Sequence, residues 1–261
     1  MFEQDKKAFI PFVTAGHPDL ESTLEIVLSL ADAGSALIEI GIPFSDPVAD
    51  GPVIQKSSFD ALRHGYTIPD YIELVQQVRS RSDVGLIFMT YLNPVLQYGL
   101  SELDRDASTA GLDGILISDL TPEEYLLMSD PDGKRIDRGL FHQLDTVFLA
   151  APTSSNERVK LISSVSTGFV YLIARTGVTG KKTQIDEAFH QSVERVRACT
   201  DLPIAVGFGI RSKSDVESVW RYADAAIVGS AIVQFVDEHQ LLPDLASRVG
   251  DYVRGQLIPG R

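Results

Sequence analysis

Three carboxylates lie close together in the segment ALIEIGIPFSDPVADGP, residues 36–52. Glu39 lies within an aliphatic run that is typical of a buried strand, and Asp46 and Asp50 follow in a proline-rich loop. A carboxylate that is removed from water without a partner is unfavourable in free energy and takes up a proton more readily. The placement therefore indicates either a misassigned strand or a working acid at Glu39, with two further acids beside it.

Side-chain alternation along residues 36–41 places Glu39 on the face opposite to Ile38 and Ile40. If the aliphatic face packs against helices, Glu39 points to the other side of the sheet. The alternative for Glu39 is an ion pair with a Lys or Arg in the interior. For Asp46 and Asp50 the alternative is turn capping through an Asx hydrogen bond, which is the usual role of a loop Asp.

Glycines collect after three apolar runs toward the end of the chain, in the segments RTGVTG, GFGI and GSAI. Glycine lets backbone N–H groups converge on an anion, and the apolar helical pattern that follows GSAI adds a helix dipole. Each segment alone is compatible with an ordinary turn, but the three together indicate a phosphate site. The residues concerned are Gly177, Gly180, Gly207, Gly209, Gly229 and Ser230.

Eight short runs rich in β-branched and apolar residues must form the elements that position these side chains. Segments with helical periodicity separate most of the runs, and several open on an Asp or Ser that can cap a helix. Continuous apolar strands are expected in a parallel sheet that helices cover on both faces. The runs are residues 8–13, 36–41, 84–91, 113–119, 146–152, 168–174, 203–209 and 224–230, and the helical segments include 19–34, 68–81, 100–111, 156–167, 184–200 and 212–223.

This alternation over 261 residues favours a single (β/α)8 TIM barrel with a parallel eight-stranded core over an open doubly wound sheet. We expect one domain over residues 1–261, because no linker rich in Gly, Pro or Ser divides the chain, and we interpret DPDG at residues 130–133 as a turn within one unit. The active site of such a barrel lies at the C-terminal ends of its strands, and its phosphate site typically uses the loops after strands 7 and 8. Glu39 and the glycine segments meet both conditions.

Composition excludes several function classes. A formal net charge of -13 and a pI near 4.7 argue against a nucleic-acid or anionic-membrane partner, since both rely on clustered Lys and Arg. The first residues have no apolar core of signal-peptide length, and no window is apolar enough for a membrane span, so we expect a cytoplasmic protein.

The single cysteine, Cys199, excludes an internal disulfide and is expected to pack on a helix. We predict no metal site, because the histidines other than His17 lack ligand spacing; they are His64, His142, His190 and His239.

Six segments in order resemble the α subunit of tryptophan synthase: IPFVTAGHPD, IEIGIPFSDPVADGPVIQ, MTYLNPV, FVYLIARTGVTG, VGFGI and VGSAIV. The resemblance runs from about residue 8 to residue 236. It implies a (β/α)8 barrel that cleaves indole-3-glycerol phosphate into indole and glyceraldehyde 3-phosphate. It also implies a pyridoxal-phosphate β subunit as partner in an αββα heterotetramer, with indole passed to that subunit and no cofactor in this chain.

The resemblance also assigns residues. Glu39 corresponds to the acid/base carboxylate, and Asp50 to the carboxylate that meets the indole nitrogen. Asp46 corresponds to a loop that faces the β subunit. Thr179 belongs to a loop that closes over the substrate. The implied indole pocket is Phe12, Ile54, Tyr91, Leu116 and Tyr171, with barrel core as the alternative for Leu116 and Ile54, and the implied phosphate site is Gly180, Phe208, Gly209, Gly229 and Ser230.

Three features depart from the family pattern. Only about seven residues precede the first expected strand, so the N-terminal covering helix is expected to be short or absent. His17 and Thr121 replace commoner residues of the family, and the segment that follows Thr121, to residue 140, is irregular.

Two other functions stay open: a stand-alone lyase that releases free indole, and a catalytically silent subunit that only activates its partner. Without the resemblance, the residues indicate a phosphate-binding barrel enzyme, with isomerases and synthases equally compatible.

Overall fold

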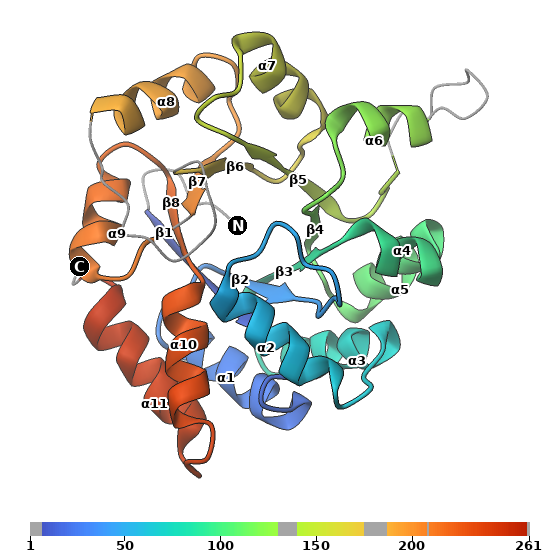
Figure 1. The fold of residues 1–261 in the computed structure, drawn as a ribbon, viewed down its shortest axis with the longest axis vertical. Coiled ribbons are helices and arrows are strands. Elements are labelled where there is room, and N and C mark those ends of the chain that lie inside the picture. Colours follow the sequence, from blue (N-terminus) through green and yellow to red (C-terminus); the bar gives the residue numbers. More distant parts are fainter. Residues whose placement is uncertain (1–6, 130–139, 175–186, 208, 260–261) are drawn as a thin grey trace.

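The computed structural model describes residues 7–129, 140–174, 187–207 and 209–259. Eight parallel strands close into one barrel in the sequential order β1 to β8, with β8 paired to β1. The strands form a ring at the centre of the molecule and the helices surround it (Figure 1). The predicted TIM barrel is confirmed.

Each strand coincides with one of the eight apolar runs, and only β1, at Thr14, and β5, at Asp145, extend one residue beyond theirs. The runs form strands because they are buried on both faces, as a parallel barrel requires. Most strands end before the corresponding run does, because the last residues of the run belong to the following loop. The strands are β1 (Ala8–Thr14), β2 (Leu37–Gly41), β3 (Gly85–Thr90), β4 (Gly114–Ile117), β5 (Asp145–Ala150), β6 (Val170–Ile173), β7 (Ile204–Gly207) and β8 (Ala225–Val228).

Helices follow the strands and present their apolar faces to the barrel, and the predicted helical segments all contain one. The helices are α1 (Leu20–Asp32), α2 (Pro52–Leu62), α3 (Ile68–Arg79), α4 (Leu92–Tyr98), α5 (Leu100–Ala110), α6 (Pro122–Met128), α7 (Asn156–Val165), α8 (Glu187–Arg197), α9 (Lys213–Trp220), α10 (Ser230–His239) and α11 (Leu245–Tyr252), which runs into a π-helical turn, η1 (Val253–Leu257). Cys199 lies partly buried in the turn just after α8. Among the described residues no helix is long and apolar enough to cross a membrane.

Side chains separate into two apolar layers at the barrel wall. Ile38 and Ile40 belong to the large cluster between strands and helices, whereas Leu37 belongs to the cluster that fills the barrel interior. Glu39 shares the parity of Leu37 and therefore points into the barrel, as the alternation predicts. The strand assignment around Glu39 is confirmed.

Two equivalent ion pairs brace the N-terminal end of the barrel. Asp113, just before β4, accepts from the guanidinium of Arg79 and from the backbone N–H of Leu86 on β3. Asp224, just before β8, accepts from Arg197 and from the N–H of Ile204 on β7 in the same way. The two arrangements are four strands apart, so each half of the barrel carries the same brace.

The irregular segment after Thr121 begins with the short helix α6, which Thr121 caps together with Glu124. The predicted DPDG turn at residues 130–133 lies outside the described residues. The described residues resume at Leu140, and the buried Asp104 of α5 binds the backbone that follows. Its two carboxylate oxygens accept the N–H groups of residues 142, 143 and 144, which places β5 in register beside β4.

Candidate active site

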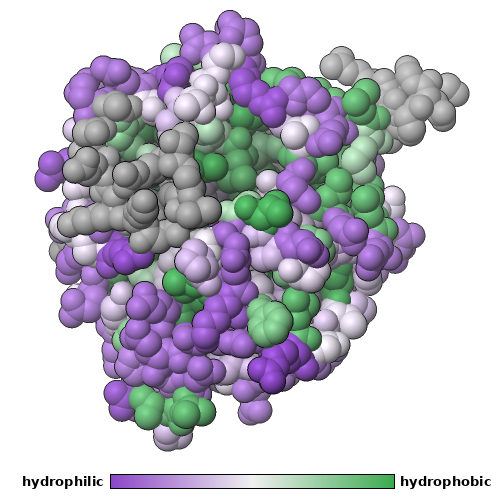
Figure 2. Space-filling view, viewed as in Figure 1, coloured by the Kyte–Doolittle hydropathy of each residue, from purple (hydrophilic) through white to green (hydrophobic). Residues whose placement is uncertain are grey.

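A cavity of about 770 Å3, including the space open to solvent, lies at the C-terminal ends of the strands. The face that carries α2 and the loop before it is hollowed at its centre, where hydrophobic atoms gather (Figure 2). The wall is mainly apolar with a few polar groups, which is the usual character of a small-molecule site. Its lining residues are Phe12, Glu39, Ala49, Asp50, Ile54, Met89, Leu149, Tyr171, Ile173, Gly209, Ile210, Arg211, Ile227, Gly229 and Ser230.

Glu39 is the buried acid of this cavity. Its side chain is almost wholly buried, and among the described residues its Oε1 atom has no hydrogen-bond partner. Burial raises the pKa of the Glu39 carboxyl to about 8, because the charged form loses its hydration. Among the described residues Glu39 forms no ion pair with a Lys or Arg, so the alternative interpretation is not supported. At neutral pH the group carries a proton that it can give to a bound molecule.

Asp50 lies in the loop that leads from β2 into α2, and it is nearly as buried as Glu39. Burial raises the pKa of its carboxyl to about 6, and the hydrogen bond from Tyr91 opposes that rise. Tyr91 Oη donates to Asp50 Oδ2 across 3.0 Å, and the Gln55 side chain donates to the Asp50 carbonyl. At pH 7 Asp50 is therefore mainly ionised while Glu39 is mainly protonated, which is the separation of roles that acid catalysis needs.

Two glycines make room for the aromatic rings of the cavity. A Cβ on Gly207 would lie 2.0 Å from the hydroxyl oxygen of Tyr171, and a Cβ on Gly41 would lie 2.3 Å from Cζ of Phe12. Gly207 belongs to one of the glycine segments that indicated a phosphate site, but its small size serves the Tyr171 ring. Burial, together with the nearby carboxylates Glu39 and Asp50, raises the pKa of Tyr171 well above its ordinary value, so its hydroxyl stays neutral.

Two glycines and a helix start lie on the side of the cavity next to β7 and β8. Gly209 has a φ of +73°, a left-handed conformation that glycine adopts without strain. Gly229 is the N-cap of α10, and Ser230 is its first residue. The first N–H groups of a helix have no partner within it, and Gly229 and Ser230 at the start of α10 both line the cavity. This side of the cavity is suited to an anion.

The structure brings most of the residues predicted to line the site to one cavity and leaves two of them, Tyr91 and Leu116, away from it. Phe12, Ile54 and Tyr171 line it with Glu39 and Asp50. Tyr91 does not line it and instead contacts Asp50 from behind. Leu116 does not line it either, because it is fully buried in the barrel interior, the alternative that its sequence context left open. Asp46 is exposed in the loop before α2. Gly177, Thr179, Gly180 and Phe208 lie outside the described residues.

Sequence reasoning missed several lining residues. Met89, Leu149, Ile173 and Ile227 are at the C-terminal ends of β3, β5, β6 and β8, and they complete the apolar wall. The parity of each strand could have found them, since they share the inward face of the barrel. Arg211 also lines the cavity just beyond β7, and no pattern in the sequence distinguished it from other exposed arginines.

The described residues hold no group of three or more His, Cys, Asp or Glu side chains that could bind a metal ion. The polar groups of the described cavity are two carboxyls, the phenol of Tyr171, the hydroxyl of Ser230 and backbone amides, together with Arg211. Such a set can move a proton and bind an anion.

Comparison with known proteins decides the family. The family model described as "Tryptophan synthase alpha chain" matches residues 1–249. The chain belongs to the tryptophan synthase alpha chain family. A tryptophan synthase alpha chain from Solibacter usitatus is 44% identical over 236 residues, covering 90% of this chain and 86% of that protein. One from Geotalea uraniireducens is 41% identical over 254 residues, covering 96% and 91%.

Solved structures of tryptophan synthases agree. Tryptophan synthase from Mycobacterium tuberculosis matches with a TM-score of 0.80 and 36% identity, covering 95% of this chain and 93% of that one. A chain of the tryptophan synthase α2β2 complex from Pyrococcus furiosus matches with a TM-score of 0.83 and 34% identity, covering 96% of both. The resemblance found in the six sequence segments is confirmed, and with it the class of enzyme, a lyase component of tryptophan synthase.

Proposed function

We propose that this chain cleaves indole-3-glycerol phosphate into indole and glyceraldehyde 3-phosphate. The observation that carries the proposal is the pair of carboxyls in one apolar cavity, with the pKa of Glu39 at about 8 and that of Asp50 at about 6. Between these values one group holds a proton and the other holds a negative charge. A retro-aldol cleavage of this substrate needs both.

Glu39 acts first as the acid. It gives its proton to C3 of the indole ring, which turns the ring into an indoleninium cation. The ionised Asp50 accepts the hydrogen bond of the ring N–H and stabilises that positive charge as it forms. Tyr91 supports this role, because its hydrogen bond favours the ionised form of Asp50.

Glu39 acts next as the base. The carboxylate left by the first step takes the proton of the glycerol hydroxyl next to the ring, and the C–C bond to C3 breaks. The electron pair of that bond returns to the ring and restores neutral indole, while the hydroxyl carbon becomes the aldehyde of glyceraldehyde 3-phosphate. Glu39 ends with the proton it began with, so the cycle is complete without another reactant.

The remaining walls hold the two ends of the substrate. The flat apolar surface of Phe12 and Ile54 suits the indole ring beside Asp50. Gly209, Gly229 and Ser230 take the phosphate, whose charge the N-terminus of α10 stabilises. The predicted indole-pocket role of Leu116 is not part of the proposal, and Tyr91 acts through Asp50.

The proposed partner is a tryptophan synthase β subunit in an αββα heterotetramer, which receives the indole and carries pyridoxal phosphate. This chain itself is proposed to use no cofactor. Chains of the P. furiosus α2β2 complex are among its structural neighbours, which supports a β partner. We expect Asp46 and Val48 to contact that partner, since both are exposed in the loop beside the cavity.

Indole release by the purified chain, measured with and without a β subunit, tests the proposal. Slow cleavage alone and faster cleavage with the partner are expected. Equal rates in both conditions would favour the stand-alone lyase. Activation of the β subunit by a chain that releases no indole in either condition would favour the silent subunit and contradict the proposal.

A further inference from the structure

A polar cluster joins α2 and α10 on the outer side of the cavity. Both helices begin at the cavity, α2 just after Asp50 and α10 at Ser230, and they contact each other. Their first turns lie side by side in Figure 1. Lys56 of α2 reaches across to α10, where its Nζ atom is 2.5 Å from Oδ1 of Asp237. The contact joins the helix that leads from the proposed indole side to the helix that begins at the proposed phosphate side.

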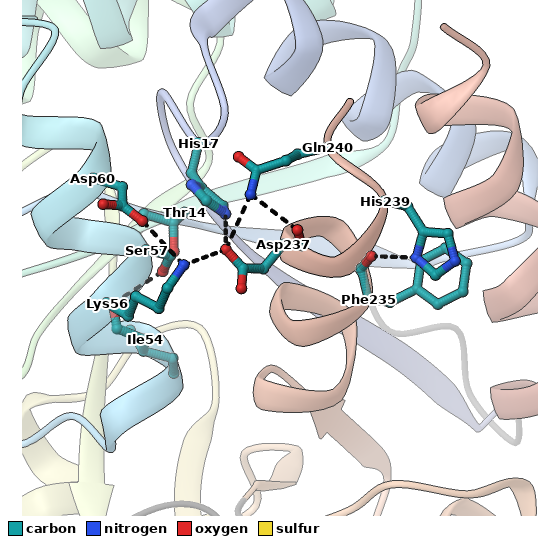
Figure 3. A network of polar contacts seen from close by, with 10 residues as sticks. All are labelled: Thr14, His17, Ile54, Lys56, Ser57, Asp60, Phe235, Asp237, His239 and Gln240. Carbon is teal, nitrogen blue, oxygen red and sulfur yellow. Dashed lines mark hydrogen bonds and ion pairs between the residues drawn. The ribbon is translucent and has the colours of Figure 1, made fainter. Parts of the chain in front are cut away.

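Other groups hold this ion pair in one arrangement. Lys56 Nζ is also 3.1 Å from Asp60 Oδ2, one turn farther along α2. Gln240 donates to both the carbonyl and the Oδ1 atom of Asp237, across 2.9 and 3.3 Å (Figure 3). The ammonium group is thus shared between two carboxylates, one of which is itself fixed by an amide.

His17 closes the inner side of the cluster. It comes from the loop after β1, its side chain is buried, and its Nε2 atom is 3.7 Å from Asp237 Oδ1 (Figure 3). Burial lowers the pKa of His17, while Asp237 and Asp60 oppose the change and Lys56 and His64 add to it. The neutral ring shields one side of the ion pair from water without replacing Lys56 as the cation.

An apolar layer connects the cluster to the cavity. Phe12 of β1, Ile54 of α2 and Val233 of α10 form one buried group, and the first two line the cavity. Val233 also borders the small space that His17 and Thr14 line. Thr14 and Ser57 share a buried hydrogen bond of 2.7 Å that ties β1 to α2. Thus α2, α10 and β1 with the loop that follows it contact one another at the cavity wall and again at the polar cluster.

We infer that Lys56 and Asp237 are positioning residues, which with His17 set the separation between the Asp50 side and the Ser230 side of the cavity. The inference rests on the proposed function, since only a substrate that contacts both sides has an affinity that depends on their separation. The affinity of a ligand that occupies only one side depends little on that separation. This difference separates a positioning role from a general contribution to folding.

The test compares a spanning ligand with two fragments. Lys56→Met removes the ammonium and keeps the stem, and Asp237→Asn keeps the shape and removes the charge. For each variant the KM for indole-3-glycerol phosphate is expected to rise by about three- to fivefold, the effect of one partly exposed ion pair. The inhibition constants of indole and of inorganic phosphate are expected to stay at their wild-type values. The double variant is expected to be no worse than the worse single variant.

A matched pair elsewhere supplies the control. Arg81, just after α3, and Glu25 of α1 form an ion pair of 3.0 Å that does not contact the cavity; the Arg81 side chain is about as exposed as that of Lys56, and Glu25 is more exposed than Asp237. Arg81→Met and Glu25→Gln should leave the KM unchanged while lowering the thermal unfolding midpoint as much as the test variants do. Lys56→Arg, which keeps the charge, should keep the wild-type KM.

Three outcomes are decisive. A KM that changes no more in the test variants than in the control variants overturns the inference. So does a parallel rise in the inhibition constants of indole and phosphate, because that reports a general distortion of the cavity. In both cases cleavage by the wild-type chain leaves the proposed function standing. A wild-type chain that cleaves no substrate overturns the proposed function itself, and the inference with it.

Discussion

The hydroxyl of Tyr91 stands between a donor and an acceptor: it accepts the backbone N–H of Ala49 and donates to Oδ2 of Asp50, each across 3.0 Å. A phenol has one hydrogen to donate, so the Ala49 contact directs that hydrogen to Asp50. Tyr91 also stacks on Phe44, with ring centroids 5.1 Å apart. The loop acid is therefore held and kept ionised by a residue outside the cavity.

Replacing Tyr91 by Phe tests this relationship. The hydrogen bond lowers the pKa of Asp50, so its loss raises that pKa and shifts the acid limb of the kcat/KM profile to higher pH. Tyr98→Phe is the matched control, because Tyr98 donates a similar bond to Asp106 away from the cavity. An acid limb that stays in place in Tyr91→Phe would contradict the assigned role.

The pH profile of cleavage by the wild-type chain should be bell-shaped. Asp50 must be ionised, which requires a pH above about 6, and Glu39 must be protonated, which requires a pH below about 8. The maximum of kcat/KM is therefore expected between these values. A rate that keeps rising above pH 8 would show that Glu39 does not act as the acid.

Removing either carboxyl should nearly abolish cleavage. Glu39→Gln and Asp50→Asn are each expected to lower the rate of indole release by about 100-fold or more, as for loss of a general acid or a charge stabiliser. Asp46→Asn is the control from the same loop. It should leave the chain alone as active as before and weaken only its activation by a β subunit. Near-normal turnover by Glu39→Gln or Asp50→Asn excludes the role given to that residue.

The buried acid should also affect stability. The folded-state pKa of Glu39 is raised from 4.5 to about 8, so its contribution is fully present below pH 4.5 and is lost as the pH rises through 8. The full loss is on the order of 5 kcal/mol. Glu39→Gln, which cannot ionise, should therefore become more stable relative to the wild type as the pH rises over this range. Urea unfolding at several pH values measures the difference, and a constant difference would refute it.

The brace at the N-terminal end of β8 should contribute to folding and not to catalysis. Asp224→Ala removes the acceptor of both Arg197 and the Ile204 N–H, and leaving such groups unpaired is worth about 1–3 kcal/mol of the free energy of unfolding. Asp251→Ala removes an exposed ion pair with Arg254 and should have little effect. Chemical denaturation measures both, with indole release as a check that the site is unchanged.

Local patterns in the sequence determined much of this protein. The eight apolar runs, the caps and the length led to a TIM barrel, because strands buried on both faces have few other arrangements. Alternation alone placed Glu39 inside the barrel, and the position of GSAI at a helix start placed Gly229 and Ser230 beside the cavity. Each of these depends on backbone geometry over a few residues, which the sequence expresses directly.

Tertiary structure decided how residues far apart in the chain meet. Tyr91 and Leu116 both follow the strand pattern, yet one contacts Asp50 from behind and the other is buried in the barrel interior, since barrel closure and stagger set the depth of each side chain. The space beside Gly207 belongs to Tyr171, a residue of another strand. The contact of Lys56 with Asp237 joins positions 181 residues apart. No local pattern encodes such distances, because they exist only once the barrel has closed.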